Sequence, residues 1–107
     1  MKYHAHIYWK NDCERGSAIS LRPSFQSLGC GIGAVHDKPI GPHPLPMYQI
    51  MYDSSNQSEV EALLKSQPMS ILLHEDVGID HVRDHTEGAR WINDPLELDL
   101  KFLEQFG

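Results

Sequence analysis

The sequence predicts one α+β domain with an antiparallel sheet whose helices cover one face. Strand-like segments, rich in aromatic and β-branched residues, alternate with helix-like segments in the order β-α-β-β-α-β. A chain of 107 residues is long enough for one modest hydrophobic core but not for two. We therefore treat residues 1–107 as a single domain, with no internal repeat, linker or low-complexity segment.

The first strand and the first helix are predicted from residues 2–23. The segment "KYHAHIYW" (2–9) alternates and has the composition of a strand. Asn11, with Glu14 three residues later, is a predicted N-cap for a helix that continues to Leu21. Pro23 lacks a backbone N–H and fixes φ, so it must end or kink that helix.

The second and third strands are predicted on either side of a proline-rich loop. "CGIGAVH" (30–36) has the pattern of a strand that two glycines weaken, and "MYQIMYD" (47–53) has that of a third strand. The loop between them contains Pro39, Pro42, Pro44 and Pro46. Prolines make the backbone stiff and extended, so His43, between two of them, is held in place at little entropic cost. The same stiffness is common in turns without chemistry, and the loop alone does not decide between these interpretations.

A second helix and a fourth strand complete the domain. Ser58 and Glu61 form a predicted capping box for a helix that Pro68 stops. "MSILLHE" (69–75) is the fourth predicted strand. This order of elements is that of the ferredoxin-like arrangement, a four-stranded antiparallel sheet with both helices on one face.

The C-terminal segment is too apolar to lie free in solvent. We expect it to cross the open face or an edge of the sheet, or to pack on a second subunit. The apolar residues that it has to bury are Trp91, Leu96, Leu98, Leu100, Phe102, Leu103 and Phe106.

The polar part of that segment, "DHTEGARW" (84–91), has two interpretations of equal weight. Asp84 or Thr86 could cap a helix that runs to Trp91. Alternatively, His85 and Arg90 could face a site, where the guanidinium would bind a carboxylate of the substrate.

Composition excludes several classes of partner. The net charge is −6 and Lys and Arg never form a run, so binding to nucleic acid or to an anionic membrane is disfavoured. No apolar run approaches the roughly 18 residues of a membrane helix, and the first residues lack the apolar stretch of a signal peptide, so we expect a cytoplasmic protein.

Cys13 and Cys30 are isolated, which favours buried small side chains over a disulfide or a zinc site.

Seven histidines are the compositional anomaly, and three of them are predicted to meet on one sheet face. His4, His6 and Tyr8 alternate along the first strand, on the face opposite to Ala5 and Ile7. In the predicted topology His74, on the fourth strand, lies beside His4 or His6. A single strand histidine is usually structural. Three converging imidazoles, however, are suitable ligands for zinc, copper, nickel or iron. A metal ion with three protein ligands keeps coordination positions open for a substrate, which is the arrangement of a catalytic site.

His43 is harder to place from topology alone. His43 and His36 both belong to the connection between the second and third strands, which lies at the end of the sheet opposite to the predicted histidine cluster. His43 could reach the cluster if the loop folded over the open face, or if it came from a partner subunit.

Four segments together resemble the bacterial and fungal DOPA 4,5-dioxygenase family. They are "YHAHIYW", "KPIGPHPLPMYQI", "ILLHE" and "RDHTEGARWINDPLELDL", which keep their order over most of the chain. The resemblance implies a small ferredoxin-like enzyme, a homodimer, that binds non-haem Fe(II), for which zinc or nickel could substitute in a purified sample. Such an enzyme uses O₂ to split a catechol ring of the DOPA type next to its two hydroxyl groups.

Carried to this sequence, the resemblance implies a set of site residues. The expected metal ligands are His6, His43 and His74, and the expected catalytic residues are His85 and His4. His85 would act from outside the ligand set or exchange protons with the substrate. His36 is a weaker candidate for a site residue than His43. The expected substrate-binding residues are Arg90, Tyr8 and Tyr48, with Met47 and Met51 as further apolar walls.

The sequence also departs from that family. Glu75 stands where the family usually has proline, residues 54–70 differ, and Asn93-Asp94-Pro95 replaces a glycine-led turn. These departures keep a second hypothesis open, a non-catalytic dimeric ferredoxin-like module that binds a metal or a small molecule. A third, weaker hypothesis is a cofactor-free enzyme in which a His/Arg pair performs acid–base chemistry on a small acid.

Overall fold

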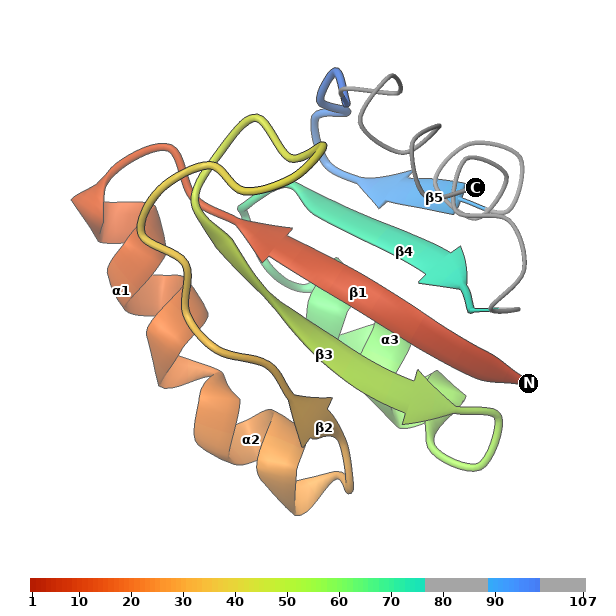
Figure 1. Ribbon diagram of the computed structural model, residues 1–107. Helices are drawn as coiled ribbons and strands as arrows, with labels where there is room; N and C mark the ends of the chain where they lie inside the picture. Colours follow the sequence, from red (N-terminus) through yellow and green to blue (C-terminus); the bar gives the residue numbers. More distant parts are fainter. Residues whose placement is uncertain (77–88, 99–107) are drawn as a thin grey trace.

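A computed structural model describes residues 1–76 and 89–98 of the chain and confirms the α+β class (Figure 1). Its antiparallel sheet has the strand order β2-β3-β1-β4-β5. The elements are β1 Lys2–Tyr8, α1 Asp12–Ser20, α2 Arg22–Ser27, β2 Gly31–Ile32, β3 Met47–Asp53, α3 Gln57–Lys65, β4 Ile71–Glu75 and β5 Ala89–Ile92.

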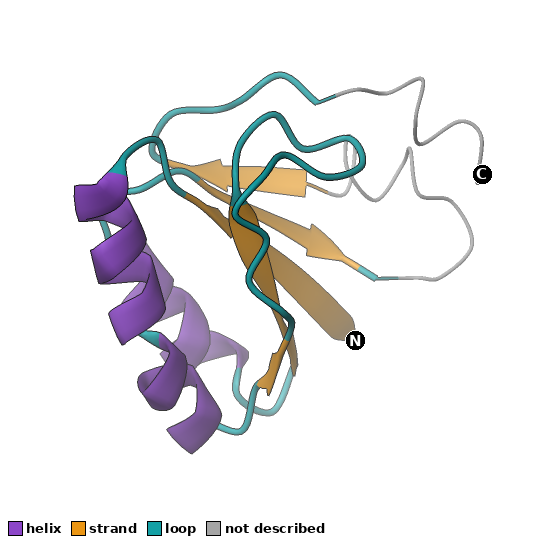
Figure 2. Cartoon of the chain, turned by 60° about the vertical axis from the view of Figure 1, so that its left-hand side comes forward, coloured by secondary structure: helices purple, strands orange, loops and turns teal. Residues whose placement is uncertain are grey.

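The helices lie on one side of the sheet, and the long connection between β2 and β3 lies on the other (Figure 2). Alternation along β1 sends Ala5 and Ile7 to the helix-covered face, as predicted, where Phe25 of α2 and Leu64 of α3 are fully buried in the same core. A second buried cluster on the open face is built around Tyr8. The sheet therefore buries side chains on both faces, and the open face is the one that carries the histidines.

The first helical region consists of two helices. Asn11 caps α1 as predicted, because its side chain accepts a hydrogen bond from the Glu14 N–H at 2.8 Å. Pro23 lies in the first turn of α2, where its missing N–H costs nothing. The chain thus bends between α1 and α2, and the proline begins a second helix rather than interrupting the first.

Two predictions in the middle of the chain were wrong in detail. The second strand is only Gly31–Ile32 instead of 30–36, and its ladder to β3 resumes as a single bridge between His36 and Met47. The predicted capping box at Ser58 is absent from α3, which begins at Gln57 after Asn56 without a side-chain cap bond. Glu61, the other half of that box, instead turns towards the sheet and bonds to tertiary partners.

The proposed helix through Trp91 is also wrong, because Ala89–Ile92 is strand β5 at the edge of the sheet. The open edge of β4 supplies backbone partners, and Trp91 opposite Leu72 joins the open-face cluster together with Leu96 and Leu98. The expectation that this segment crosses the open face or an edge of the sheet is confirmed for residues 89–98, which pair with the edge of β4 and also pack on the open face. Residues 99–107, with the other apolar side chains of the tail, lie outside the described residues.

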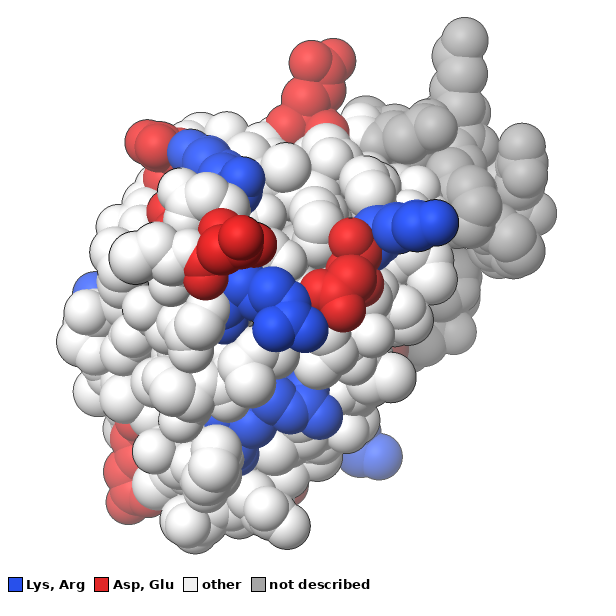
Figure 3. Space-filling model, turned by 90° about the vertical axis from the view of Figure 1, so that its left-hand side faces the viewer, with Lys and Arg blue, Asp and Glu red and all other residues white. Residues whose placement is uncertain are grey.

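Charged side chains of both signs are interspersed on the side of the molecule that carries α1 and α2 (Figure 3). Arg15 and Asp37 form a two-pronged ion pair, with N–O distances of 2.7 and 3.2 Å. This pair ties α1 to the segment between β2 and β3. None of the helices in the described part of the chain has the length and apolar character that crossing a bilayer requires.

Candidate functional site

Two histidines meet at the centre of the open face. His4 is paired with His74 across β1 and β4, and His6 is the next residue of β1 on the same face. The Nε2 atoms of His6 and His74 are 2.9 Å apart, and both side chains are almost fully buried. The predicted convergence of these strand histidines is confirmed.

The backbone fixes the tautomer of His74. Its Nδ1 lies 3.0 Å from the carbonyl oxygen of Glu75, and a carbonyl oxygen only accepts hydrogen bonds. The proton of His74 is therefore on Nδ1, which leaves a lone pair on Nε2. In this arrangement His6 donates its Nε2–H to that lone pair. The lone pair of His74 thus points at the place where the two rings meet.

His43 reaches the same place from the proline-rich loop of the same chain. Its ring centroid is 4.3 Å from that of His6, and the residue is only 8% exposed. The Tyr8 hydroxyl is 2.7 Å from Nδ1 of His43. The loop therefore folds over the open face, as one of the two predicted alternatives required, and no second subunit is needed to bring His43 to the cluster (Figure 2).

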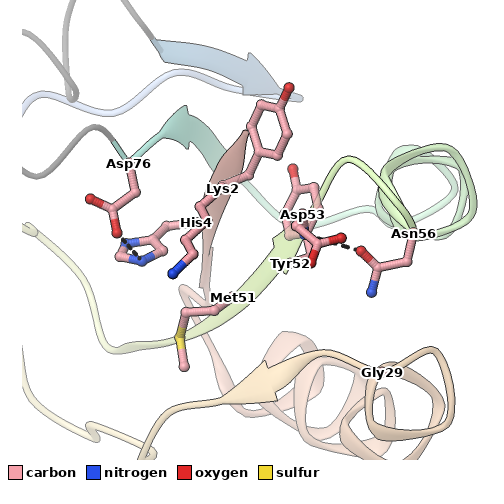
Figure 4. A pocket seen from close by; sticks show the side chains of 9 residues that line it. Lys2, His4, Gly29, Met51, Tyr52, Asp53, Asn56 and Asp76 are labelled. Atoms are coloured by element: carbon pink, nitrogen blue, oxygen red, sulfur yellow. Dashed lines mark hydrogen bonds and ion pairs between the residues drawn. The ribbon is translucent and has the colours of Figure 1, made fainter.

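His4 extends the cluster towards the beginning of β1 (Figure 4). Its Nε2 is 3.0 Å from a carboxylate oxygen of Asp76, the residue that follows β4. Its ring contacts that of His74 edge to face, with centroids 5.3 Å apart. Asp76 thus orients an imidazole beside the buried pair, in a position that solvent still reaches.

Two cavities border these residues. One, of about 380 Å³, is lined by His6 and His43 together with the segment that leads into the loop and with β3. The other, of about 320 Å³, is lined by His4, Asp76 and the ends of β1 and β3 (Figure 4). The second wraps around the end of the sheet and includes helix-face residues such as Tyr52. The first is the better candidate for a ligand, because it reaches His6 and His43, two of the three buried site histidines.

The tyrosines and Arg90 divide between the two faces. Tyr8 is on the histidine face and stacks on Trp91 with ring centroids 6.0 Å apart. Tyr48 faces the helices, where its hydroxyl donates to the Ala18 carbonyl at 2.5 Å. Arg90 also faces the helices and pairs with Glu61 at 2.8 Å. The structure therefore brings Tyr8 to the histidines, and it places Tyr48 and Arg90, both expected to bind substrate, on the opposite face.

The remaining expected residues have mixed placements. Met47 and Met51 alternate with Gln49 along β3 on the histidine face. His85 lies outside the described residues. Sequence reasoning did not single out Gln49 or Asp76. Gln49 could have been found from its alternation with the two methionines, whereas Asp76 depends on how the chain leaves β4.

The histidine cluster has the donor chemistry of a transition-metal site. Two nitrogens bound to one ion at about 2.1 Å, with their bonds at right angles, lie roughly 3 Å apart. The 2.9 Å between the Nε2 atoms of His6 and His74 matches that spacing. Within residues 1–76 and 89–98, no three His, Cys, Asp or Glu side chains are arranged to hold one ion. The described part thus supplies two converging nitrogens, and the imidazole of His43 lies tilted against the ring of His6.

Comparison with known proteins gives concordant results. The model of the Dopa 4,5-dioxygenase family matches residues 3–102. The chain is 30% identical to the DOPA 4,5-dioxygenase of Amanita muscaria, over 95% of the chain and 49% of that protein. It is 31% identical to an uncharacterised 21.2 kDa protein of Botryotinia fuckeliana, over 64% of the chain and 43% of that protein. The chain spans about half the length of these curated relatives.

A crystal structure has the same fold. It is that of a "putative dioxygenase" from Nostoc punctiforme, with a TM-score of 0.91 and 32% sequence identity. The match covers 99% of this chain and 93% of the other. The similarity therefore extends over the sheet, the helices and the loop that carries His43.

Proposed function

The chain belongs to the Dopa 4,5-dioxygenase family, and from this premise we propose that it is a non-haem iron(II) extradiol dioxygenase. Its substrate would be a catechol with a side chain of the DOPA type. The reaction joins one catechol and one O₂, breaks the ring carbon–carbon bond next to the two hydroxyl carbons, and keeps both oxygen atoms in the ring-opened product. The substrate supplies all four electrons that O₂ accepts, so no further reductant is consumed.

The observation that carries this proposal is the meeting of His6 and His74 beside a cavity that His6 and His43 line. These three histidines are the proposed ligands of the ion. They would hold an iron ion, which when bound would supply Lewis-acid and redox chemistry for the reaction of a catechol with O₂. The Glu75 carbonyl accepts the Nδ1–H of His74, which leaves the lone pair of this imidazole on Nε2. Metal-binding imidazoles usually have such an oxygen partner for their second nitrogen.

His4 is the proposed proton acceptor. Asp76, 3.0 Å from Nε2 of His4, stabilises a positive charge on this imidazole and holds its orientation. Met47, which lines the cavity, and Tyr8, which packs with it on the open face, would form an apolar wall for the catechol ring and exclude water from it. His85 remains a proposed second acid–base residue, on the strength of the family resemblance alone.

The proposed ferredoxin-like description rests on the order of elements. The strand order β2-β3-β1-β4, with the helices on one face, supports it, and β5 extends the sheet beyond that plan. The proposed homodimer rests on the family resemblance.

A second function, a binding module without catalysis, is favoured by one observation. The described residues do not hold three metal-binding side chains around one point. A protein in which His6 and His74 bind an ion weakly, or in which the cavity binds an aromatic molecule without turnover, would have this arrangement.

Anaerobic loading with Fe(II), followed by a panel of catechols under air, separates the two functions. A dioxygenase binds one iron per chain, consumes one O₂ per catechol and forms a coloured ring-opened product. His6→Ala, His43→Ala and His74→Ala should each lose iron, whereas the matched control His4→Ala should keep iron and lose turnover. If all three ligand variants retain full iron binding, the ligand assignment is wrong. Iron binding without O₂ uptake for any catechol would favour the binding module.

A further inference from the structure

The cavity beside the histidines has a second polar wall that the proposed chemistry does not use. His36 and Gln49 line this cavity of about 380 Å³ on the side of β3 and the loop, together with His6 and His43. A volume of this size is in the range of small-molecule sites, which combine apolar walls with a few placed polar groups. The polar groups on this wall therefore have a ligand-sized space in front of them.

Both side chains are directed into the cavity by backbone pairing. Gln49 is paired with His6 across β3 and β1, and directly paired residues share a face of the sheet. His36 is bridged to Met47, with backbone N–O distances of 2.9 and 3.0 Å in the two directions. Because Met47 belongs to the open-face cluster, His36 faces the same side. The short bridge thus fixes a polar residue of the loop over the site.

Because Gly33 has no side chain, Gln49 can pack directly against its backbone. A Cβ at position 33 would lie 3.2 Å from the Gln49 carbonyl oxygen and 3.3 Å from Cγ of its side chain. Gly33 also donates its N–H to that carbonyl at 2.8 Å, so the two segments lie close together. A larger residue here would displace Gln49 and narrow the cavity.

The amide of Gln49 is available for a ligand. Among the described residues, the one hydrogen-bond contact of the Gln49 side chain is a 3.5 Å approach of Nε2 to the sulfur of Met51, and a thioether is a weak acceptor. The described residues that line this cavity include neither an aspartate nor a glutamate. A carboxylate on a bound molecule would therefore meet hydrogen-bond donors and no opposing carboxylate.

We propose that His36 and Gln49 are specificity-determining residues that bind a carboxylate on the ring substituent of the substrate. This inference rests on the proposed function for the placement of the ring at His6 and His43. It moves the role of carboxylate anchor, expected of Arg90, to two residues on the histidine face. The ring would lie against the buried histidines, and its substituent would extend towards β3 and the loop.

Anaerobic calorimetry on the Fe(II)-loaded protein tests this inference without turnover. The probes are 3-(3,4-dihydroxyphenyl)propanoate and its neutral counterpart 4-propylcatechol. The unaltered protein should bind the acid at least about tenfold more tightly, a difference of roughly 1.4 kcal/mol. Gln49→Leu and His36→Ala should each remove most of that preference and leave the Kd of 4-propylcatechol within about twofold. Lys38→Ala, an exposed residue of the same loop that does not line the cavity, is the matched control and should change neither Kd.

Several outcomes would overturn the inference. One is that the unaltered protein binds the two probes with equal Kd or binds neither. The others are that the variants keep the preference for the acid, or that they weaken the binding of both probes equally. Gly33→Ala adds an independent check, because it should weaken the binding of the acid more than that of the neutral probe. The preference and its loss in the variants, observed together with no O₂ uptake, would instead refute the proposed dioxygenase and leave the carboxylate site standing.

Discussion

Tyr8 and Tyr48 show how one residue type serves two purposes in this protein. The Tyr8 hydroxyl lies 2.7 Å from Nδ1 of His43 on the histidine face, and the Tyr48 hydroxyl binds the Ala18 carbonyl on the helix face. Burial raises the pKa of both phenols well above their usual range, so both stay protonated at physiological pH. A neutral hydroxyl both donates and accepts, so Tyr8 can hold His43 in either tautomer of the imidazole.

Replacing Tyr8 by Phe should therefore loosen His43 without removing a proposed ligand. Loss of a group that orients a ligand typically weakens metal binding by about 10-fold or more, and we expect a decrease of about 10-fold in Fe(II) affinity for Tyr8→Phe. Anaerobic Fe(II) titration with a competing chelator measures it. Tyr48→Phe is the matched control, which should cost about 1 kcal/mol of folding stability and leave iron affinity unchanged. Equal iron affinity in Tyr8→Phe and the unaltered protein would show that Tyr8 does not position a ligand.

At the scale of elements, one carboxylate of α3 is bound by β3, by β5 and by a residue of its own helix. Glu61 of α3 accepts hydrogen bonds from Arg90 of β5 at 2.8 Å, from Tyr52 of β3 at 3.0 Å and from Gln57 at 3.1 Å. Burial alone would raise the pKa of Glu61, but these hydrogen bonds outweigh it and lower the pKa below the ordinary value of 4.5. The ionised form of Glu61 therefore ties the edge strand to the helix layer.

The pH dependence of stability should report this contact. Because the pKa of Glu61 is lowered in the folded state, its contribution is fully present above about pH 4.5 and is lost as the pH falls through the lower, folded-state pKa. Glu61→Gln should lower the free energy of unfolding by about 1–2 kcal/mol at pH 7, near the low end because the Arg90 side chain is half exposed. Urea unfolding at pH 7 and pH 3 measures this. The variant should be closer to the unaltered protein at pH 3; an equal difference at both pH values would contradict the account.

The same elements show what the sequence could and could not predict. Alternation of polar and apolar residues predicted β1, β3 and β4, and with them the face shared by His4 and His6. Four residues are too few to show a period, so β5 became recognisable only from its pairing with the edge of β4. The capping box failed because tertiary partners of Glu61 outcompete a local cap, and a local pattern does not reveal such partners.

On the scale of the whole molecule, one chain supplies the three proposed ligands. His6 comes from β1, His74 from β4 and His43 from a loop that crosses the open face of the same chain. The sequence left open whether His43 acts in its own subunit, because loop direction depends on contacts such as the bridge between His36 and Met47. A homodimer, if it forms, would not be needed to complete this ligand set.

Iron binding should therefore be independent of assembly. Dilution through the range in which sedimentation velocity shows any dimer dissociating should leave the iron content per chain unchanged within about 20%. A fall of the iron content in parallel with the dimer fraction would show that a second subunit contributes a ligand. Mixing His43→Ala with His74→Ala protein gives a second check, since a site within one chain cannot be restored by subunit exchange.

The most direct test of the central claim is the iron content and O₂ uptake of the anaerobically Fe(II)-loaded protein, compared with His6→Ala and His74→Ala. We predict about one iron per chain and one O₂ consumed per catechol cleaved for the unaltered protein, and loss of both in each variant. Full iron binding in both variants, or bound iron in the unaltered protein with no O₂ consumed for any catechol, would contradict it.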